Sequence, residues 1–127
     1  MAKGFCTTVK ATEGTITMNP TNFSGFDVNY NWIAKLGNIV CGCIRMTSTT
    51  NTGQMSGGDA VIGNVPWKPK QLLSVLMCLY GGGNVSAQYG STSLSIDTNG
   101  EIKSGAVPAF SGARYFLTTQ FIYVTDD

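Results

Sequence analysis

The stretch that decides the fold is QLLSVLMCLY, residues 71–80, the most apolar part of the chain. Pro66 and Pro69 precede it and the run GGGN follows it. Both boundaries oppose helix extension, and so short an apolar segment favours a β-strand. A strand that is apolar on both faces needs cover on both. One face therefore belongs to the core of a small β domain, and the other requires a second sheet, a loop layer or another copy of the chain. The two faces are Leu73, Val75, Met77 and Leu79, and Leu72, Leu76, Cys78 and Tyr80.

Two other segments share this property. Residues 29–46 contain NYNWIAKL and IVCGCIRM on either side of Gly37-Asn38, a two-residue hairpin turn that begins with glycine. That turn predicts a register in which the second strand is apolar on both faces. Residues 113–125 are rich in aromatic and β-branched residues and are again apolar on both sides. Three such strands exceed what one small core can bury, so the surplus predicts a subunit interface. The hairpin register pairs Leu36 with Ile39, Ala34 with Cys41, Trp32 with Cys43 and Tyr30 with Arg45.

The rest of the chain predicts further short strands. Residues 5–11 and 15–18 indicate a modest hairpin around Glu13-Gly14, and residues 92–102 indicate another around DTNG. A type I turn from Asp97 with a left-handed Gly100 is favoured because it places residues 96 and 102 on one face. Residues 47–58 lack periodicity and predict an exposed loop, and a second loop is expected around Phe110. About ten short strands without a helix predict an all-β, antiparallel, jelly-roll-like β-sandwich that forms a single domain over residues 1–127.

Composition and charge limit the classes of partner. Charged residues make up 12% of the 127 residues, and eight basic against seven acidic residues give a formal net charge of +1. The basic residues are scattered, so no nucleic-acid partner is expected. No segment reaches the length of a membrane span, and the N-terminus lacks the apolar run of a signal peptide. We therefore expect synthesis in the cytoplasm and no membrane insertion.

Four cysteines and no histidine limit the chemistry. Cys41 and Cys43 share one strand face, where geometry disfavours a mutual disulfide. Their spacing is a weak match to structural zinc sites, so small buried hydrophobes are the favoured interpretation and neither metal nor cofactor is expected. Without histidine, Ser-His-Asp and Cys-His arrangements are excluded within the chain. Among the carboxylates only Asp59, beside two glycines, is unusual, and enzymatic activity is not expected.

The order of motifs over residues 28–125 resembles the C-terminal head domains of phage tail fibres and baseplate receptor-binding proteins. That family has a Lys-x-Gly-x-Val hairpin, a Leu-Pro-x-x-x-x-Pro corner and an I-x-x-x-G-x-I hairpin in this order. The corner is shorter here, and residues 1–27 match no part of the family, so they are either a neck or a domain edge. The matching segments are YNWIAKLGNIV at 30–40, VPWKP at 65–69, LSIDTNGEI at 94–102 and a terminal strand that ends near Tyr123.

The resemblance implies a homotrimer at the tip of a virion tail appendage. There it would attach the particle to a saccharide on the host bacterial surface and contact other tail or baseplate proteins. One alternative is a structural trimerisation or baseplate-assembly module without a ligand of its own. Another is a non-viral adhesin, which would carry a secretion signal.

A saccharide site needs an exposed aromatic ring to stack on the sugar, with amides, hydroxyls or charges nearby. Trp67 lies in the proline corner beside two lysines, although packing over the end of the sandwich is the favoured interpretation for this ring. Tyr80 with Asn84, across the glycine run, forms a second candidate set. A third set contains Gln88, Tyr89 and Arg114, and for the arginine a salt bridge or interface contact is the favoured alternative.

Overall fold

The computed structural model describes residues 10–20, 23–24, 26–28, 30–48, 53–55, 61–81, 88–105, 107–110 and 115–127. Within these ranges the regular structure consists of antiparallel β-strands. The described residues contain no apolar helix of membrane-spanning length. The strands are β1 (Thr12–Gly14), β2 (Thr17–Met18), β3 (Phe23–Ser24), β4 (Phe26–Asp27), β5 (Trp32–Leu36), β6 (Ile39–Ser48), β7 (Gly53–Met55), β8 (Val61–Asn64), β9 (Leu73–Gly81), β10 (Gln88–Ile96), β11 (Glu101–Ser104), β12 (Val107–Phe110) and β13 (Tyr115–Val124).

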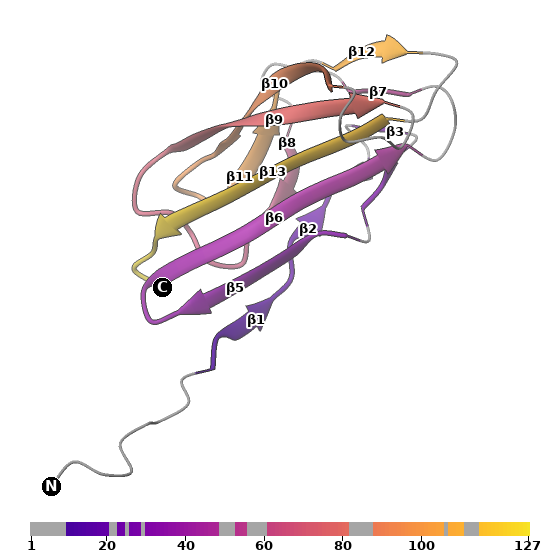
Figure 1. Cartoon of the computed structure of the whole chain (residues 1–127). Coiled ribbons are helices and arrows are strands. Elements are labelled where there is room, and N and C mark those ends of the chain that lie inside the picture. Colours follow the sequence, from indigo (N-terminus) through magenta and orange to yellow (C-terminus); the bar gives the residue numbers. More distant parts are fainter. Residues whose placement is uncertain are drawn as a thin grey trace, which may run out of the picture.

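One large sheet contains most of these strands, in the order β1-β5-β6-β13-β9-β10-β11-β8-β2, with β4 paired to β6. Figure 1 shows that this sheet curls, so that β10, β11 and β8 lie behind β9, β13 and β6. A second sheet, β12-β7-β3, lies at the end of the molecule where β6 ends and β13 begins (Figure 1). The prediction of an all-β, antiparallel fold is confirmed, and the interior is enclosed by a curled sheet in the shape of a half-barrel.

The core lies inside this curl. Successive side chains of a strand point to opposite faces, so one alternate set of each long strand is buried. Each large apolar side chain in this set stabilises the fold by about 1.5–3 kcal/mol relative to exposure. The largest fully buried side chains are Ile33, Val40, Ile44, Met46, Ile62, Met77, Leu94, Ile96, Ile102 and Leu117.

Both favoured hairpin turns are confirmed. Gly37 has a φ of 61°, and β5 pairs with β6 in the predicted register over residues 32–36. Gly100 has a φ of 90°, and its amide donates to the Asp97 carbonyl at 2.8 Å. Ile96 pairs with Ile102, and both side chains are fully buried. The turn that keeps these two residues on one face is therefore the turn that the core requires.

The predicted N-terminal hairpin is wrong. Residues 12–14 form β1, which pairs with β5, whereas β2 pairs with β8 at the opposite edge of the large sheet. Gly14 belongs to strand β1 and makes no turn. A Cβ atom at this position would approach the Trp67 ring to 2.7 Å, so the glycine permits close packing of the ring on the strand. Residues 5–9 of that prediction lie outside the described residues.

Two predicted loops also contain strands. Residues 53–55 form β7 and residues 107–110 form β12, and these strands pair with each other. The loop prediction is therefore wrong at these positions, and also at residues 47–48, which belong to β6. Backbone hydrogen bonds between strands need no apolar periodicity in the side chains, so the absence of periodicity did not exclude pairing.

Candidate interaction surface

The outer side of β5, β6, β13 and β9 carries large apolar side chains in contact with solvent. Their exposed fractions range from 39% for Ile39 to 69% for Leu76. β6, β9 and β13 are the three segments that the sequence predicts to be apolar on both sides, and each has one side in the core and one exposed. We call this surface the outer apolar face and define it by Trp32, Leu36, Ile39, Leu72, Leu76, Ile122 and Val124.

Strand register makes part of this face continuous. Leu36 of β5 pairs with Ile39 of β6, and Ile39 pairs with Val124 of β13. The next outward row joins Ala34, Cys41 and Ile122 in the same way. Directly opposed side chains on a sheet lie within contact distance, so these rows form one apolar patch. The outer apolar face ends at β10. There the residues that pair with the outward positions of β9 are Ser91, Ser93 and Ser95.

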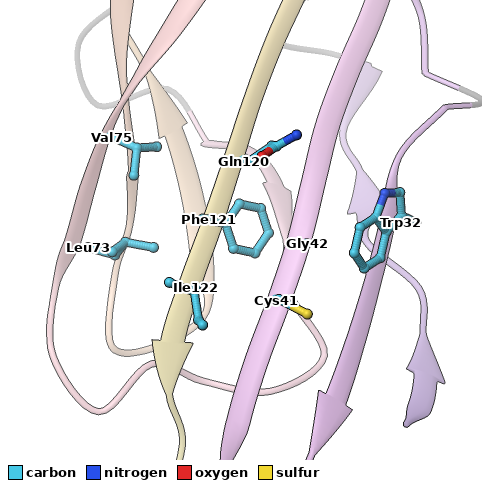
Figure 2. Close-up of a pocket in the computed structure, with 8 residues that line it drawn as sticks. All are labelled: Trp32, Cys41, Gly42, Leu73, Val75, Gln120, Phe121 and Ile122. Carbon is cyan, nitrogen blue, oxygen red and sulfur yellow. The ribbon is translucent and has the colours of Figure 1, made fainter.

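A hollow of about 540 Å³ lies in this face beside β13. The pairing of β13 with β9 runs only from Tyr115–Gly81 to Thr118–Cys78. The Thr119 hydroxyl then donates to the Leu76 carbonyl at 2.7 Å, beyond the last paired residues. The residues of the hollow belong to β5, β6, β9 and β13, and Figure 2 shows them from Leu73 and Val75 on β9 to Trp32 on β5. Its lining is mainly apolar and suits an apolar side chain. The lining residues are Trp32, Cys41, Gly42, Leu73, Val75, Gln120, Phe121 and Ile122.

Three cysteines of the large sheet are free thiols: Cys41 is exposed, and Cys43 and Cys78 are half-buried. The expectation of a buried thiol is wrong for Cys41, because its position on β6 points away from the core. Burial raises the pKa of the Cys43 thiol, and the nearby charge of Arg45 partly offsets this effect. Cys6 and Asp59 lie outside the described residues. Within the described residues, no group of three or more histidine, cysteine or acidic residues is placed to bind a metal ion.

On the outer side of the large sheet, aromatic and charged residues replace aliphatic ones at the end near the small sheet. The guanidinium carbon of Arg45 lies 5.3 Å from the ring centroid of Tyr30 and 5.1 Å from that of Phe116. The Arg45 amide donates to Asn31 Oδ1 at 2.8 Å. We call Tyr30, Arg45 and Phe116 the arginine cluster. The hairpin register had placed Tyr30 opposite Arg45, but Phe116 comes from a strand distant in sequence and gave no local signal.

Trp67 is placed as a packing residue. Its ring is half-buried against the core and lies over Gly14, and Lys35 Nζ lies 5.3 Å from its centroid. Its carbonyl oxygen accepts a hydrogen bond from the Tyr123 hydroxyl at 2.5 Å. These contacts favour the interpretation in which the ring covers one end of the domain.

Three other sequence-predicted site residues, Tyr80, Gln88 and Tyr89, lie at the opposite end. Tyr80 pairs with Gln88 across β9 and β10, and Tyr89 follows on β10. Tyr80 also pairs with Phe116, whereas the corner of Trp67 is joined by the bridge between residues 69 and 125. Nine residues of strand separate these points, which corresponds to about 30 Å. Trp67 and Tyr80 therefore do not belong to one small-ligand site. Asn84 and Arg114 lie outside the described residues.

The buried hydroxyl of Tyr123 makes stability depend on pH. Burial raises the pKa of Tyr123 well above its ordinary value, and the charge of Asp127 raises it further. The folded chain therefore keeps this proton at a pH where the unfolded chain loses it. The resulting contribution to stability is complete below about pH 10 and is lost as the pH rises through the folded pKa.

Tyr123→Phe is expected to lower the free energy of unfolding at neutral pH by about 1–1.5 kcal/mol, because the Trp67 carbonyl loses its donor. It should also reduce the loss of stability between about pH 9 and pH 11. Urea unfolding at both pH values measures this, with Tyr30→Phe as the exposed control. An alkaline stability loss as large in Tyr123→Phe as in the wild type would contradict the assignment.

Comparison of the chain with known protein families, curated proteins and solved structures finds no match. The functional argument therefore depends on the sequence pattern and on the geometry of the outer apolar face. The fold alone does not define an activity.

Proposed function

We propose that the chain is the head domain of a phage tail fibre or baseplate receptor-binding protein. In this role it self-associates through the outer apolar face and attaches the virion to a saccharide on the host bacterial surface. The observation that carries the proposal is this face, since a monomer rarely exposes so many large apolar residues on adjoining strands. The two hairpins that carry the family resemblance, around Gly37 and Gly100, both fold as hairpins, which supports the assignment.

The proposed assembly is a homotrimer of jelly-roll-like β-sandwiches at the tail tip or baseplate. Obligate interfaces resemble a domain core cut in half, and a face made of tryptophan, leucine, isoleucine and valine has that composition. Trp32 and Ile122 at the hollow are suited to contact a second copy, because aromatic and aliphatic anchors in pockets supply most of the binding free energy at such interfaces. Other tail or baseplate proteins are the further partners of this assembly.

The proposed ligand contact lies at the end of the sheet that contains Tyr80. Among the residues predicted from the sequence, Tyr80 and Gln88 are the two that strand pairing brings together. The two residue types, an aromatic and an amide, are those that sugar binding requires. The role is binding, without catalysis, metal or cofactor.

A second candidate is favoured by the same exposed face. It is an assembly module that trimerises a fibre or joins a baseplate without a ligand of its own, because the outer apolar face explains association and says nothing about a sugar. Both candidates require an oligomer, and they differ only in saccharide binding.

A glycan array of bacterial capsule, lipopolysaccharide and cell-wall saccharides separates the two candidates when the purified full chain is applied. The attachment role predicts saturable binding to at least one saccharide class. An oligomer that binds none of them, and does not adsorb to bacterial cells, supports the assembly module. A chain that stays monomeric and binds none contradicts both.

A further inference from the structure

We propose that the arginine cluster is a binding site for an anionic saccharide, a sugar that carries a carboxylate or a phosphate group. This inference rests on the proposed function, because it assigns a ligand class and a site to the same attachment role. It differs from the sequence-based candidates, none of which includes Tyr30, Arg45 or Phe116.

The Arg45 side chain is held in place and available to a ligand. Two rings approach its guanidinium carbon, at 5.3 Å for Tyr30 and 5.1 Å for Phe116, while the residue as a whole stays exposed. Rings stack on the flat face of a guanidinium and leave the N–H groups, which lie in its plane, able to donate. The backbone of Arg45 is fixed by pairing in β6 and by the bond of its amide to Asn31. The charge is therefore preorganised, which lowers the ordering cost of binding.

The charge of Arg45 also lacks a partner within the described part of the chain. Two lysines there pair with acids, Lys103 with Asp97 at 2.9 Å and Lys70 with Asp126 at 3.7 Å, whereas Arg45 forms no ion pair with any described residue. A planar guanidinium matches the two oxygens of a carboxylate or a phosphate and binds either in a bidentate manner. A neutral sugar would leave this charge uncompensated.

A second, independent observation marks the same place. Within the described residues, the two buried side-chain atoms without a hydrogen-bond partner are Asn31 Nδ2 and Thr47 Oγ1. Asn31 holds the Arg45 amide, and Thr47 is the cross-strand partner of Phe116. Buried polar atoms are normally satisfied, and exceptions point to an absent water, ion or ligand group. Both exceptions adjoin the arginine cluster.

The neighbouring groups favour a saccharide over a simple inorganic anion. Tyr30 as a residue is 55% exposed, and its ring offers a surface for stacking on a sugar ring. A cation beside an exposed aromatic ring suits a ligand that combines a sugar ring with a negative charge.

The site stays reachable when copies of the chain associate. Arg45 pairs with Thr118, four residues along β13 from Ile122 at the centre of the aliphatic rows. That separation corresponds to about 13 Å along the strand. The aliphatic part of the face can therefore be buried while the arginine cluster lies at its rim, next to Trp32, which is two residues from Tyr30.

Titration calorimetry of the full chain tests the proposal with three probes: an oligogalacturonate, a phosphorylated mannan oligosaccharide and a neutral glucan oligosaccharide. We expect at least one anionic probe to bind 10-fold or more tightly than the glucan, which is about 1.4 kcal/mol. Arg45→Gln should weaken that binding at least about 10-fold. Arg45→Lys should give an intermediate value, because it keeps the charge and loses the planar fork. Lys70→Gln, which removes the same charge from a distant exposed ion pair, should change binding less than about twofold.

The two anionic probes distinguish a carboxylate-bearing from a phosphate-bearing ligand. The proposal is overturned if Arg45→Gln binds as tightly as the wild type, or if the neutral glucan binds best. A changed oligomer mass in Arg45→Gln would also overturn it, since the cluster would then be an interface contact. Retained saccharide binding in Arg45→Gln would contradict the site at the arginine cluster and would still be consistent with the proposed attachment role. A wild-type chain that binds no saccharide of any kind would contradict both the site and the attachment role.

Discussion

Ile122→Asp is expected to convert the proposed oligomer into a monomer of 13.5 kDa. Ile122 is 65% exposed on β13, lines the hollow beside Trp32 and forms a row with Cys41. Burial of each isoleucine contributes about 1.5–3 kcal/mol to association. A carboxylate in the same place adds a desolvation penalty of several kcal/mol per chain. Because every copy carries the change, the combined loss exceeds what an oligomer of ordinary affinity tolerates.

Sedimentation velocity on the variant and the wild type measures this effect. The matched control is Thr98→Asp, which adds the same charge at an exposed turn between β10 and β11. The control should keep the wild-type sedimentation coefficient. Circular dichroism should show an intact β fold in both variants, since neither side chain lies in the core. An Ile122→Asp chain that sediments like the wild type would place the interface elsewhere.

Gly42→Ala is expected to lower the free energy of unfolding by about 1–3 kcal/mol. Gly42 is buried on β6 between β5 and β13. An added Cβ would lie 2.6 Å from the Phe121 ring and 2.9 Å from the Trp32 carbonyl oxygen. The ring could move, but the carbonyl belongs to the paired backbone of the neighbouring strand. Replacement of a strand glycine by alanine is ordinarily favourable by roughly 0.5–1 kcal/mol, so the sign of the effect is diagnostic.

Urea unfolding in the monomeric Ile122→Asp background gives this free energy without a contribution from subunit dissociation. Ser74→Ala is the control, because it places an alanine at an exposed position of β9 and adds no atom to the core. The control should change stability by less than about 0.5 kcal/mol. A Gly42→Ala chain as stable as its parent would mean that Phe121 does not pack over this glycine.

Local sequence signals predicted the two confirmed hairpins. The left-handed conformations at Gly37 and Gly100 follow from residues adjacent in the chain, so the register between paired strands could be read directly. The segments of β6, β9 and β13 were likewise predicted to be apolar on both sides, one side in the core and the other in need of further cover. In the structure one side of each strand lies in the core and the other is exposed. These features need no information about distant contacts.

Features that depend on distant partners were not predictable in the same way. β1 and β2 are two to three residues long and pair with strands at opposite edges, so the intervening Gly14 looked like a turn. The role of this glycine depends on Trp67, more than fifty residues away. Cys41 was expected to be buried, and this expectation failed because β6 is apolar on both sides. The sequence pattern therefore does not show which side of the strand faces the core.

The arginine cluster illustrates the same limit at the candidate site. The hairpin register placed Tyr30 opposite Arg45, yet one tyrosine beside one arginine is an ordinary surface pair. The cluster takes shape only when β13 brings the Phe116 ring to 5.1 Å from the guanidinium carbon. The unpartnered atoms of Asn31 and Thr47 are likewise visible only in three dimensions.

The central claim is that the outer apolar face joins copies of the chain. Sedimentation equilibrium of the wild-type chain tests it most directly, because this measurement gives mass without assumptions about shape. The account predicts a mass three times the 13.5 kDa of one chain. A mass of 13.5 kDa at every concentration, with the β fold intact, would contradict it.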